Sequence, residues 1–372
     1  MIPYGRQNIS QDDIDSMVSV LRSSYLTQGP EVARFEQALC DYCHADYAVA
    51  VNSATSALHL ACLALGVGPD DHVWTSPISF VASANCALYC GAKVDFVDVE
   101  ENSGLMSVSS LREKLAIADQ QGTLPKVIIP VHYSGQSCDM KSIRQLAKKY
   151  GFHVIEDASH ALGARYLDEN VGSCRYSDIC VFSFHPVKML TTGEGGAALC
   201  NGQKNHEKMQ RLRSHGIVKD GHAEPWAYQQ IDLGYNYRMS DMAASLGISQ
   251  IKRLDLFLEK RRLIATKYNE AINNSLIRPI VQSRQGTSSF HLYPVLLKDS
   301  DTRRAFYDYL LENGITGQVH YIPIFKQPYY QSIKGNWPQT ESFYQKVLSI
   351  PIFYDLSEAD QEKVVKVVNR FS

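Results

Sequence analysis

A lysine that follows a predicted strand is the residue of this chain best suited to nucleophilic chemistry. The apolar run 179–182 is followed by the hydroxyl of Ser183, and Lys188 comes five residues later. Rigid structure around a strand end shields an amine from water, and a desolvated amine is more often neutral and reactive near pH 7. Most loop lysines are simply solvated, so the prediction depends on what accompanies Lys188.

An aspartate and a hydroxyl-rich helix start accompany this lysine. Asp157 ends the apolar run 152–156, and a carboxylate at the end of a buried strand needs a cation beside it. Segment 52–57 leads from a strand into an apolar helix, and a helix start offers free N–H groups to a phosphate. Taken singly, Asp157 and segment 52–57 are explained as well by ordinary helix capping, and His160 by a hydrogen-bonded core histidine.

Together these groups match the requirements of pyridoxal 5'-phosphate. That cofactor needs a lysine for its aldehyde, an acid beside its ring nitrogen and a cup for its phosphate. Lys188, Asp157 and segment 52–57 supply these three from strand ends, and Ser183 adds a hydroxyl. The combination is far more specific than any of its members.

Short apolar strands alternate with helical stretches up to about residue 250. We expect strands at 47–51, 73–75, 94–98, 126–131, 152–156, 179–182 and 197–200, and helices at 55–65, 79–90, 108–117, 139–150 and 240–255. Such alternation predicts a mainly parallel sheet covered by helices on both faces. In that architecture ligands bind at the carboxyl ends of the strands, where the groups described above lie.

The sequence changes character after the helical run 240–272. We expect a strand at 288–297, a helix at 302–313, a second strand at 314–320 and a terminal helix at 357–371. The predicted organisation has three parts: an N-terminal segment 1–25 that packs near the small domain, a large domain 26–250, and a small α+β domain 251–372.

Composition argues against several classes of protein. The chain has 372 residues and a net charge of −2, which is not the basic footprint of a nucleic-acid-binding protein. No apolar run is long enough to span a bilayer, and the start lacks the apolar core of a signal peptide, so we expect a cytoplasmic protein without membrane contact. The nine cysteines are scattered through apolar segments, which predicts reduced thiols. Segment 40–44 matches a haem-attachment pattern, but no export signal or axial ligand accompanies it.

Five segments resemble the signatures of DegT/StrS-type sugar-nucleotide aminotransferases: 52–57, 76–80, 156–161, 183–188 and 234–239. The resemblance covers essentially the whole chain. Segments 26–29, 75–82 and 318–321 are most similar to one branch of that family, the C4 aminotransferases of pseudaminic acid biosynthesis. The resemblance implies an α/β fold of the fold type I, aspartate aminotransferase-like class, and a homodimer with shared active sites.

The resemblance also implies roles for individual residues. Lys188 would bind the cofactor's aldehyde and move protons, Asp157 would face the ring nitrogen, Phe80 would stack on the ring, and His160 would lie near the ring hydroxyl. The phosphate contacts implied are those of Ala54, Thr55, Ser183 and, from the partner subunit, Asn236. The substrate contacts implied are those of Tyr4, Ser24, Tyr25, Leu26, Thr27, Arg238, Gln318, Val319, His320 and Tyr321. No residue is assigned to a metal.

The reaction implied is transfer of the amino group of L-glutamate to C4 of a UDP-linked sugar, UDP-2-acetamido-2,6-dideoxy-β-L-arabino-hexos-4-ulose. Ser24 and Ile322 stand where close relatives can carry lysine. The residues that contact the nucleotide diphosphate are therefore not assigned. Alternatives are a different nucleotide 4-keto or 3-keto sugar, and a non-catalytic regulatory protein that binds the cofactor. Relatives that dehydrate sugars carry histidine at the lysine position, so Lys188 argues against dehydration. The polar insert 218–230 is either a loop over the site or plain surface.

Overall fold

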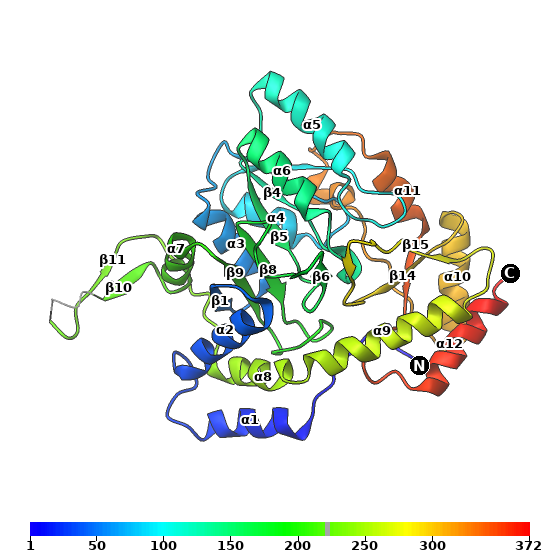
Figure 1. The fold of residues 1–372 in the computed structure, drawn as a ribbon, viewed down its shortest axis with the longest axis horizontal. Coiled ribbons are helices and arrows are strands. Elements are labelled where there is room, and N and C mark those ends of the chain that lie inside the picture. Colours follow the sequence, from blue (N-terminus) through cyan, green and yellow to red (C-terminus); the bar gives the residue numbers. More distant parts are fainter. Residues whose placement is uncertain (220–223) are drawn as a thin grey trace.

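The computed structural model describes residues 1–219 and 224–372 (Figure 1). A seven-stranded sheet lies at its centre, in the order β1-β9-β8-β5-β4-β2-β3. These strands are β1 (Tyr47–Val51), β2 (His72–Thr75), β3 (Lys93–Phe96), β4 (Val127–Ile129), β5 (His153–Asp157), β8 (Ile179–Ser183) and β9 (Gly196–Cys200). Only β9 of this sheet runs against the others. The predicted mainly parallel sheet is therefore confirmed.

Side chains of alternating strand residues divide between two apolar layers, as the two-residue period of a strand requires. In β8, Val181 packs into one layer while Cys180 and Phe182 pack into the opposite one. The first layer is completed by α3 (Ala54–Ala64), α4 (Ala82–Tyr89) and α7 (Gln203–Arg213). The opposite face is covered by α2 (Pro30–Cys43), α5 (Val108–Gln121), α6 (Met140–Tyr150) and α8 (Asp241–Ile251).

The C-terminal part of the chain has its own sheet and its own apolar cluster. The sheet is antiparallel and contains β12 (Arg278–Pro279), β14 (Tyr293–Leu296) and β15 (Val347–Ile350). The helices beside it are α9 (Leu254–Ala271), α10 (Ser300–Glu312), α11 (Pro338–Lys346) and α12 (Glu358–Arg370), with 3-10 turns at Ile324–Lys326 and Pro328–Tyr330. Ile2 packs into this cluster, whereas α1 (Gln11–Leu21) packs on α8. The domain boundaries at 25 and 250 stay predictions.

Three expected elements differ from those observed. The expected strand 314–320 was wrong: around Gly317 this segment pairs only at single residues, through the bridges of Ile315 and Gln318. The strand β15, which contains Ser349, the bridge partner of Gln318, was not predicted. The helical run 240–272 is broken between α8 and α9. The helix expected at 79–90 begins only at Ala82, so Ser79 and Phe80 lie in the loop that follows β2.

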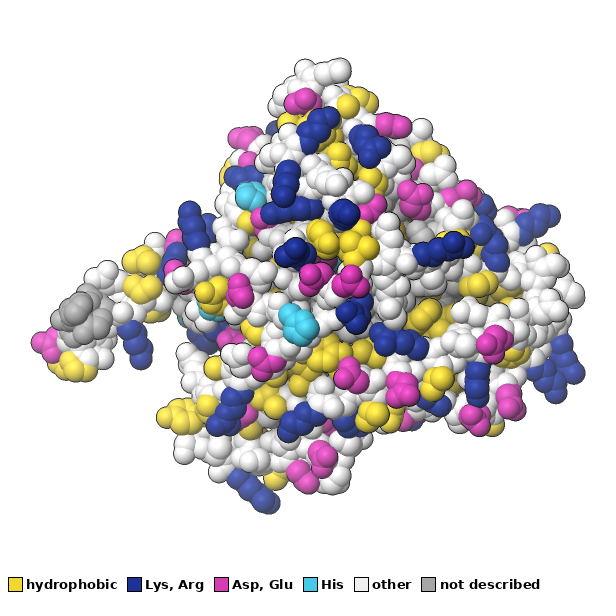
Figure 2. Space-filling view, viewed as in Figure 1, with side chains coloured by type: hydrophobic (Ala, Val, Ile, Leu, Met, Phe, Trp, Pro, Cys, Tyr) yellow, Lys and Arg dark blue, Asp and Glu magenta, His cyan; other side chains and the backbone are white. Residues whose placement is uncertain are grey.

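Two further small antiparallel sheets occur among the described residues, besides the C-terminal sheet. One contains β6 (Arg165–Tyr166), β7 (Glu169–Asn170) and β13 (Gly286–Thr287), near the 3-10 turn Tyr133–Gly135. The other is the hairpin of β10 (Ile217–Lys219) and β11 (Tyr228–Gln230), which projects from the body of the molecule with apolar side chains on its surface (Figures 1 and 2). The insert expected at 218–230 forms most of this hairpin, and its residues 220–223 lie outside the described residues. Among the described helices none is both long and apolar enough to cross a membrane.

Candidate active site

A cavity of about 440 Å³ opens at the carboxyl ends of the central parallel strands. The loops that follow β2, β4, β5 and β8 and the first turn of α3 reach it, as the architecture predicts. Of the residues predicted from the sequence, the cavity is lined by Tyr4, Ala54, Thr55, Phe80, Asp157, His160, Ser183, Lys188, Gln318, His320 and Tyr321. The fold thus brings together side chains that are more than three hundred residues apart in sequence.

Lys188 occupies the loop that follows β8. Burial lowers the pKa of its amine to about 8, and the opposing charge of Asp157 prevents a larger fall. The loop is held by backbone hydrogen bonds, because Lys188 N–H donates to the carbonyl of His185 at 2.8 Å and Thr192 N–H donates to that of Phe184 at 3.0 Å. A fixed amine that is partly neutral near pH 8 is suited to attack a carbonyl.

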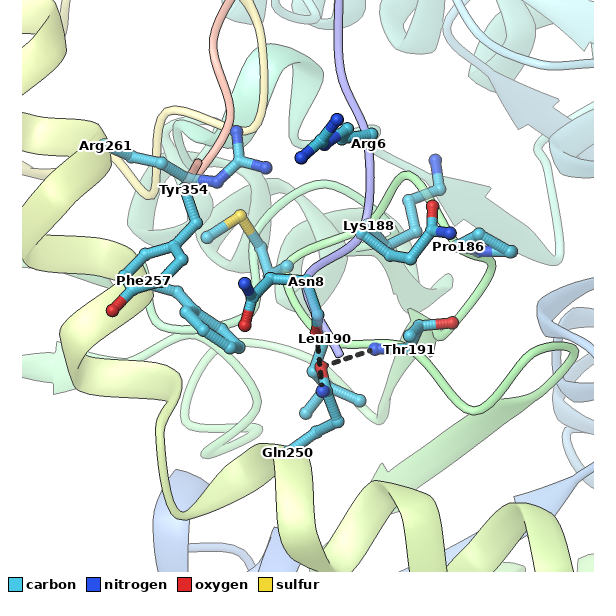
Figure 3. A pocket seen from close by; sticks show the side chains of 12 residues that line it. Arg6, Asn8, Pro186, Lys188, Leu190, Thr191, Gln250, Phe257, Arg261 and Tyr354 are labelled. Carbon is cyan, nitrogen blue, oxygen red and sulfur yellow. Dashed lines mark hydrogen bonds between the residues drawn. The ribbon is translucent and has the colours of Figure 1, made fainter. Parts of the chain in front are cut away.

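The back of this loop is fastened to α8 (Figure 3). Thr191 N–H donates to Oε1 of Gln250 at 3.5 Å, and Nε2 of Gln250 donates to the carbonyl of Asn8 at 2.9 Å. The pocket between them, which Arg6 and Arg261 also border, measures only about 10 Å³. That is room for about one water molecule, so this pocket supports the loop and is not a second ligand site.

Asp157 ends β5 and is almost completely buried. Its two carboxylate oxygens accept hydrogen bonds from the hydroxyls of Ser83 and Ser159, each at 2.6 Å, and Ser159 N–H donates to it at 3.2 Å. Within residues 1–219 and 224–372 it forms no salt bridge. A buried carboxylate that is held only by neutral donors, two hydroxyls and one backbone N–H, can accept a cationic partner from the cavity.

The first turn of α3 forms a cradle with free N–H groups. Ser53 caps the helix by accepting from Ser56 N–H at 3.1 Å, and Ala54 and Thr55 face the cavity. The first amides of a helix have no partner within the helix and favour an anion. Gly196 of β9 packs directly against this turn, where an added Cβ would lie 2.4 Å from the Ala54 nitrogen.

Four histidines line the same cavity, and three of them, His160, His291 and His320, have a pKa lowered by burial. Burial, and then the charge of Lys188, lowers the pKa of His320 to about 3, and the pKa of His160 falls well below its ordinary value for the same reasons. Nε2 of His160 lies 3.0 Å from the Tyr321 hydroxyl. The ring centroids of His160 and His291 are 4.4 Å apart. All three rings are therefore neutral at physiological pH and act as hydrogen-bonding groups rather than as cations.

Other residues predicted for the site lie outside this cavity. Thr27 pairs with Ser240, and the Leu26 carbonyl accepts from Asp241 N–H, so the segment of Ser24 and Tyr25 lies along the start of α8. Val319 packs into the apolar clusters. The remaining two are Asn236, which bridges to Ser214, and Arg238, which bridges to Val51.

Sequence reasoning missed three residues that complete the site. Ser83 and Ser159 hold Asp157, and His291 lines the cavity against His160 with its Nδ1 buried and unpartnered. Ser159 follows Asp157 by two residues, a spacing that permits a side-chain bond and that was a usable signal. Ser83 and His291 come from distant segments, and nothing local in the sequence connects them with Asp157 or Lys188.

The donor set fits pyridoxal phosphate. The cavity contains a partly neutral lysine, a buried carboxylate without an ionic partner, and a helix start with free amides. Exposed Phe80 adds an aromatic face, with its ring centroid 6.5 Å from that of Tyr321. In the described part of the chain no cluster of three or more metal-binding side chains occurs. The arrangement can therefore bind an anionic, aromatic carbonyl compound and move a proton beside it.

Comparison with known proteins also identifies an aminotransferase. The model of the DegT/DnrJ/EryC1/StrS aminotransferase family matches residues 7–369. A protein of Campylobacter jejuni (serotype O:23/36, strain 81-176) named UDP-4-amino-4,6-dideoxy-N-acetyl-beta-L-altrosamine transaminase is 42% identical over 369 residues, which are 98% of this chain and 96% of that protein.

Solved structures are similar over the whole chain. Helicobacter pylori PseC, described as an aminotransferase involved in the biosynthesis of pseudoaminic acid, has a TM-score of 0.92 at 31% identity and is matched over 99% of this chain and 98% of its own. The PLP form of the putative sugar aminotransferase Spr1654 of Streptococcus pneumoniae has a TM-score of 0.90 at 27% identity, with coverage of 99% and 97%. The expected aspartate aminotransferase-like fold is confirmed.

Proposed function

Because the chain belongs to the DegT/DnrJ/EryC1/StrS aminotransferase family, we propose that it uses pyridoxal 5'-phosphate to aminate C4 of a UDP-linked 4-keto-6-deoxy-N-acetylhexosamine. The amino donor is L-glutamate, and the keto sugar is UDP-2-acetamido-2,6-dideoxy-β-L-arabino-hexos-4-ulose, an intermediate of pseudaminic acid biosynthesis. The observation that carries the proposal is the convergence of Lys188, Asp157 and the α3 cradle on one cavity. The name of the 42% identical relative supports the choice of sugar.

The cofactor would be held by groups that are already in place. Ala54, Thr55 and Ser183 would bind its phosphate, since all three line the cavity and two of them lie in the first turn of α3. Asp157 would face the ring nitrogen and keep it protonated. When bound, pyridoxal phosphate supplies an electron-withdrawing ring that stabilises negative charge at a carbon that loses its proton.

Lys188 is the proton carrier of the proposed reaction. Its amine takes a proton from the α-carbon of glutamate and later delivers one to C4 of the sugar. The lowered pKa, about 8, keeps a useful fraction of the amine neutral, and Asp157 keeps the same amine from becoming too weak a base. Neutral His160 and His320 leave Lys188 as the group that exchanges protons with substrate.

The substrate would be bound by residues that line the cavity. Tyr4, Gln318, His320 and Tyr321 line it, and their polar groups suit the hydroxyl and amide groups of an acetamido sugar or the carboxylates of glutamate. Of the other predicted contacts, Ser24 to Thr27 are exposed beside the start of α8, and Arg238 is half-buried just before that helix. Those surface contacts would act on the cavity of a second subunit.

The proposed assembly is a homodimer, in the cytoplasm. Large apolar side chains on and beside the projecting hairpin support it, because Trp226 is 77% exposed and Leu233 is 82% exposed. Exposed apolar surface of this kind is typical of an interface that the single chain leaves open. In the dimer, Asn236 would reach the phosphate in the partner's cavity.

Product analysis with defined sugars tests the proposal. The purified protein, loaded with pyridoxal phosphate, is incubated with L-glutamate and UDP-linked 4-keto sugars of the L-arabino and D-xylo series, and the products are assigned by NMR. We expect an amine at C4 of the L-arabino sugar and an equal amount of 2-oxoglutarate. Preference for the D-xylo sugar, or amination at C3, would assign a different sugar to the same chemistry. A yellow protein whose colour persists with glutamate would instead be a cofactor-binding regulator.

A further inference from the structure

The end of β5 that carries Asp157 is joined to β4 by an interrupted ladder. Regular pairing of the two strands ends at Val154, and the same register returns at the isolated bridge between Val131 and Asp157. Pro130 lies in the gap, and a proline has no N–H to donate. On this side, Asp157 N–H donates to the Pro130 carbonyl at 2.9 Å, and His132 N–H donates to the Asp157 carbonyl at 3.0 Å. The position of Asp157 therefore depends on the short segment that follows β4.

The buried side chains of Glu156 and His132 join the same two segments. Nε2 of His132 lies 2.6 Å from Oε2 of Glu156. The Ser177 hydroxyl donates to the other carboxylate oxygen of Glu156, and Cys138 N–H donates to Nδ1 of His132 at 3.3 Å. Because Nδ1 accepts this bond, the proton of the ring is on Nε2 and is donated to Glu156. All four polar atoms of the pair therefore have partners, and a buried network that is fully satisfied in this way fixes its own geometry.

The pair lies on the face of the sheet that is turned away from the cavity. Successive residues of a strand point to opposite faces. Asp157 pairs with Val181, whose side chain packs in the layer of α3 and α4, whereas Glu156 pairs with Cys180, which packs in the opposite layer. Asp157 lines the cavity, and neither Glu156 nor His132 does. Any effect of the pair on chemistry in the cavity must therefore pass through the end of β5.

We propose that Glu156 and His132 are positioning residues, which hold the carboxylate of Asp157 at a fixed place opposite Lys188. This role rests on the proposed function, because it is the contact of Asp157 with the cofactor's ring nitrogen that requires a fixed carboxylate. A buried hydrogen-bonded pair adds little net stability over apolar side chains of the same shape, so what it contributes here is geometry. The two serine hydroxyls orient the carboxylate, whereas the pair fixes the backbone from which that carboxylate projects.

The groups packed against the pair do not give it another role. Burial raises the pKa of the Cys174 and Cys180 thiols well above the ordinary value, so both stay neutral beside Glu156. A carboxylate, an imidazole and a thiol near one another could suggest a metal site. Among the residues that the structure describes, however, no group of three or more such side chains could hold a metal ion.

The amine of Lys188 reports where the Asp157 carboxylate lies. Burial lowers the pKa of this amine to about 8, and the charge that opposes the fall is that of Asp157. Glu156 does not act on this pKa directly, so a change at Glu156 reaches Lys188 only if Asp157 moves. Because the attraction between charges weakens with distance, a displaced Asp157 would leave Lys188 with a lower pKa.

Titration of Lys188 in the full chain without cofactor tests the inference. The protein is treated with an amine-reactive reagent between about pH 6 and about pH 10, and modification of Lys188 is measured by mass spectrometry. Glu156→Met removes both bonds of the carboxylate, so it should lower the Lys188 pKa by at least ~0.5 unit and lower kcat of the cofactor-loaded protein ~10-fold. Glu156→Gln can still accept from His132 and donate to Ser177, so its Lys188 pKa should stay within ~0.2 unit of the wild-type value.

Two further variants separate positioning from loss of stability. Ser177→Ala removes one bond of Glu156 and should shift the Lys188 pKa in the same direction by less, which keeps the test usable if Glu156→Met does not fold. Tyr268→Phe is the matched control, because it removes the bond from the buried Tyr268 hydroxyl to the Pro351 carbonyl, at 2.8 Å, in the C-terminal apolar cluster. It should lower Tm and leave the Lys188 pKa unchanged.

Three results would overturn the inference. The first is an unchanged Lys188 pKa in Glu156→Met, or in Ser177→Ala if Glu156→Met does not fold. The second is an equal shift in Tyr268→Phe, which would make the effect one of general stability. The third is an equal shift in Glu156→Gln, which would assign the effect to charge instead of position. Failure of the proposed function is seen separately, as a wild-type protein without amino transfer, because the Lys188 titration needs neither cofactor nor substrate.

Discussion

The surroundings of Lys188 and the surface around the projecting hairpin differ in how completely one chain builds them. Lys188 and Asp157 are enclosed, and each is held by hydrogen bonds from the same chain. Trp226 on the hairpin and Leu233 just after it are largely exposed, and Tyr25 beside α8 is exposed as well. The difference supports two parts of the proposal: that proton transfer uses a site built by one chain, and that sugar recognition uses surfaces that a second subunit completes.

The largest effect is expected from removal of the amine at the enclosed site. Lys188→Ala should lower the rate of amino transfer at least ~10³-fold, because general acid–base and nucleophilic roles are both lost. The readout is kcat with glutamate and the keto sugar, and Lys204→Ala, an exposed lysine on α7, is the matched control. Lys188→Ala with a rate near that of the control would show that proton transfer uses another group.

Neutralising the buried carboxylate should change the lysine as well as the rate. In the protein without cofactor, Asp157→Asn should move the pKa of Lys188 below its present value of about 8, since the charge of Asp157 now raises it. Cofactor attachment requires the neutral amine, so its rate should reach half-maximum at a lower pH. Stopped-flow absorbance across pH 6 to 10, an interval of about 4 units around that value, measures this shift. Ser159→Ala, which keeps the carboxylate, is the control, and an equal shift in it would contradict the electrostatic explanation.

The open region is tested by polar substitutions on the hairpin. Trp226→Ser combined with Leu233→Ser should weaken the dimer by about 2 kcal/mol, or ~30-fold in Kd, because large apolar anchors dominate such interfaces. Sedimentation velocity at several concentrations measures the effect. Tyr329→Ser is the matched control, because Tyr329 is 79% exposed and lies elsewhere. If the double variant dimerises as the wild type does, the hairpin is not part of the interface.

The smallest effect is expected at His291, which supports the enclosed site without exchanging protons. Burial holds its pKa well below the ordinary value, so the ring is neutral at any pH above that lowered pKa. His291→Asn should therefore lower kcat/KM only several-fold, ~1 kcal/mol, and leave the shape of the pH profile unchanged. Loss of one limb of the profile would show instead that His291 titrates during turnover.

The two regions also differ in how well the sequence predicts them. The strand ends that carry Ser183 and Asp157 follow runs of apolar residues, so their place at one edge of the sheet was predictable from local pattern alone. The family resemblance added Phe80 and His160, and the cavity includes both. The seven expected strands of the central sheet all exist, with boundaries that differ by a few residues.

Three features of the site were not predictable from the sequence, because they depend on contacts between distant segments. Ser83 reaches Asp157 across 74 residues, and its own surroundings in the sequence show only a small polar residue in a helix. The residues of segment 314–320 suit a strand, yet the segment forms only two isolated bridges, of Ile315 with Ile2 and of Gln318 with Ser349. The position of Tyr4 in the cavity depends on the C-terminal part of the chain, where the Tyr4 carbonyl accepts from Ile352 N–H at 3.0 Å.

Chemical trapping of the cofactor tests the central claim most directly. The cofactor-loaded protein is reduced with borohydride, which makes the bond between lysine and cofactor permanent, and is then digested and sequenced by mass spectrometry. We predict a single pyridoxyl-modified lysine, Lys188. Modification of any other lysine, or no modification under conditions in which the protein is yellow, would contradict it.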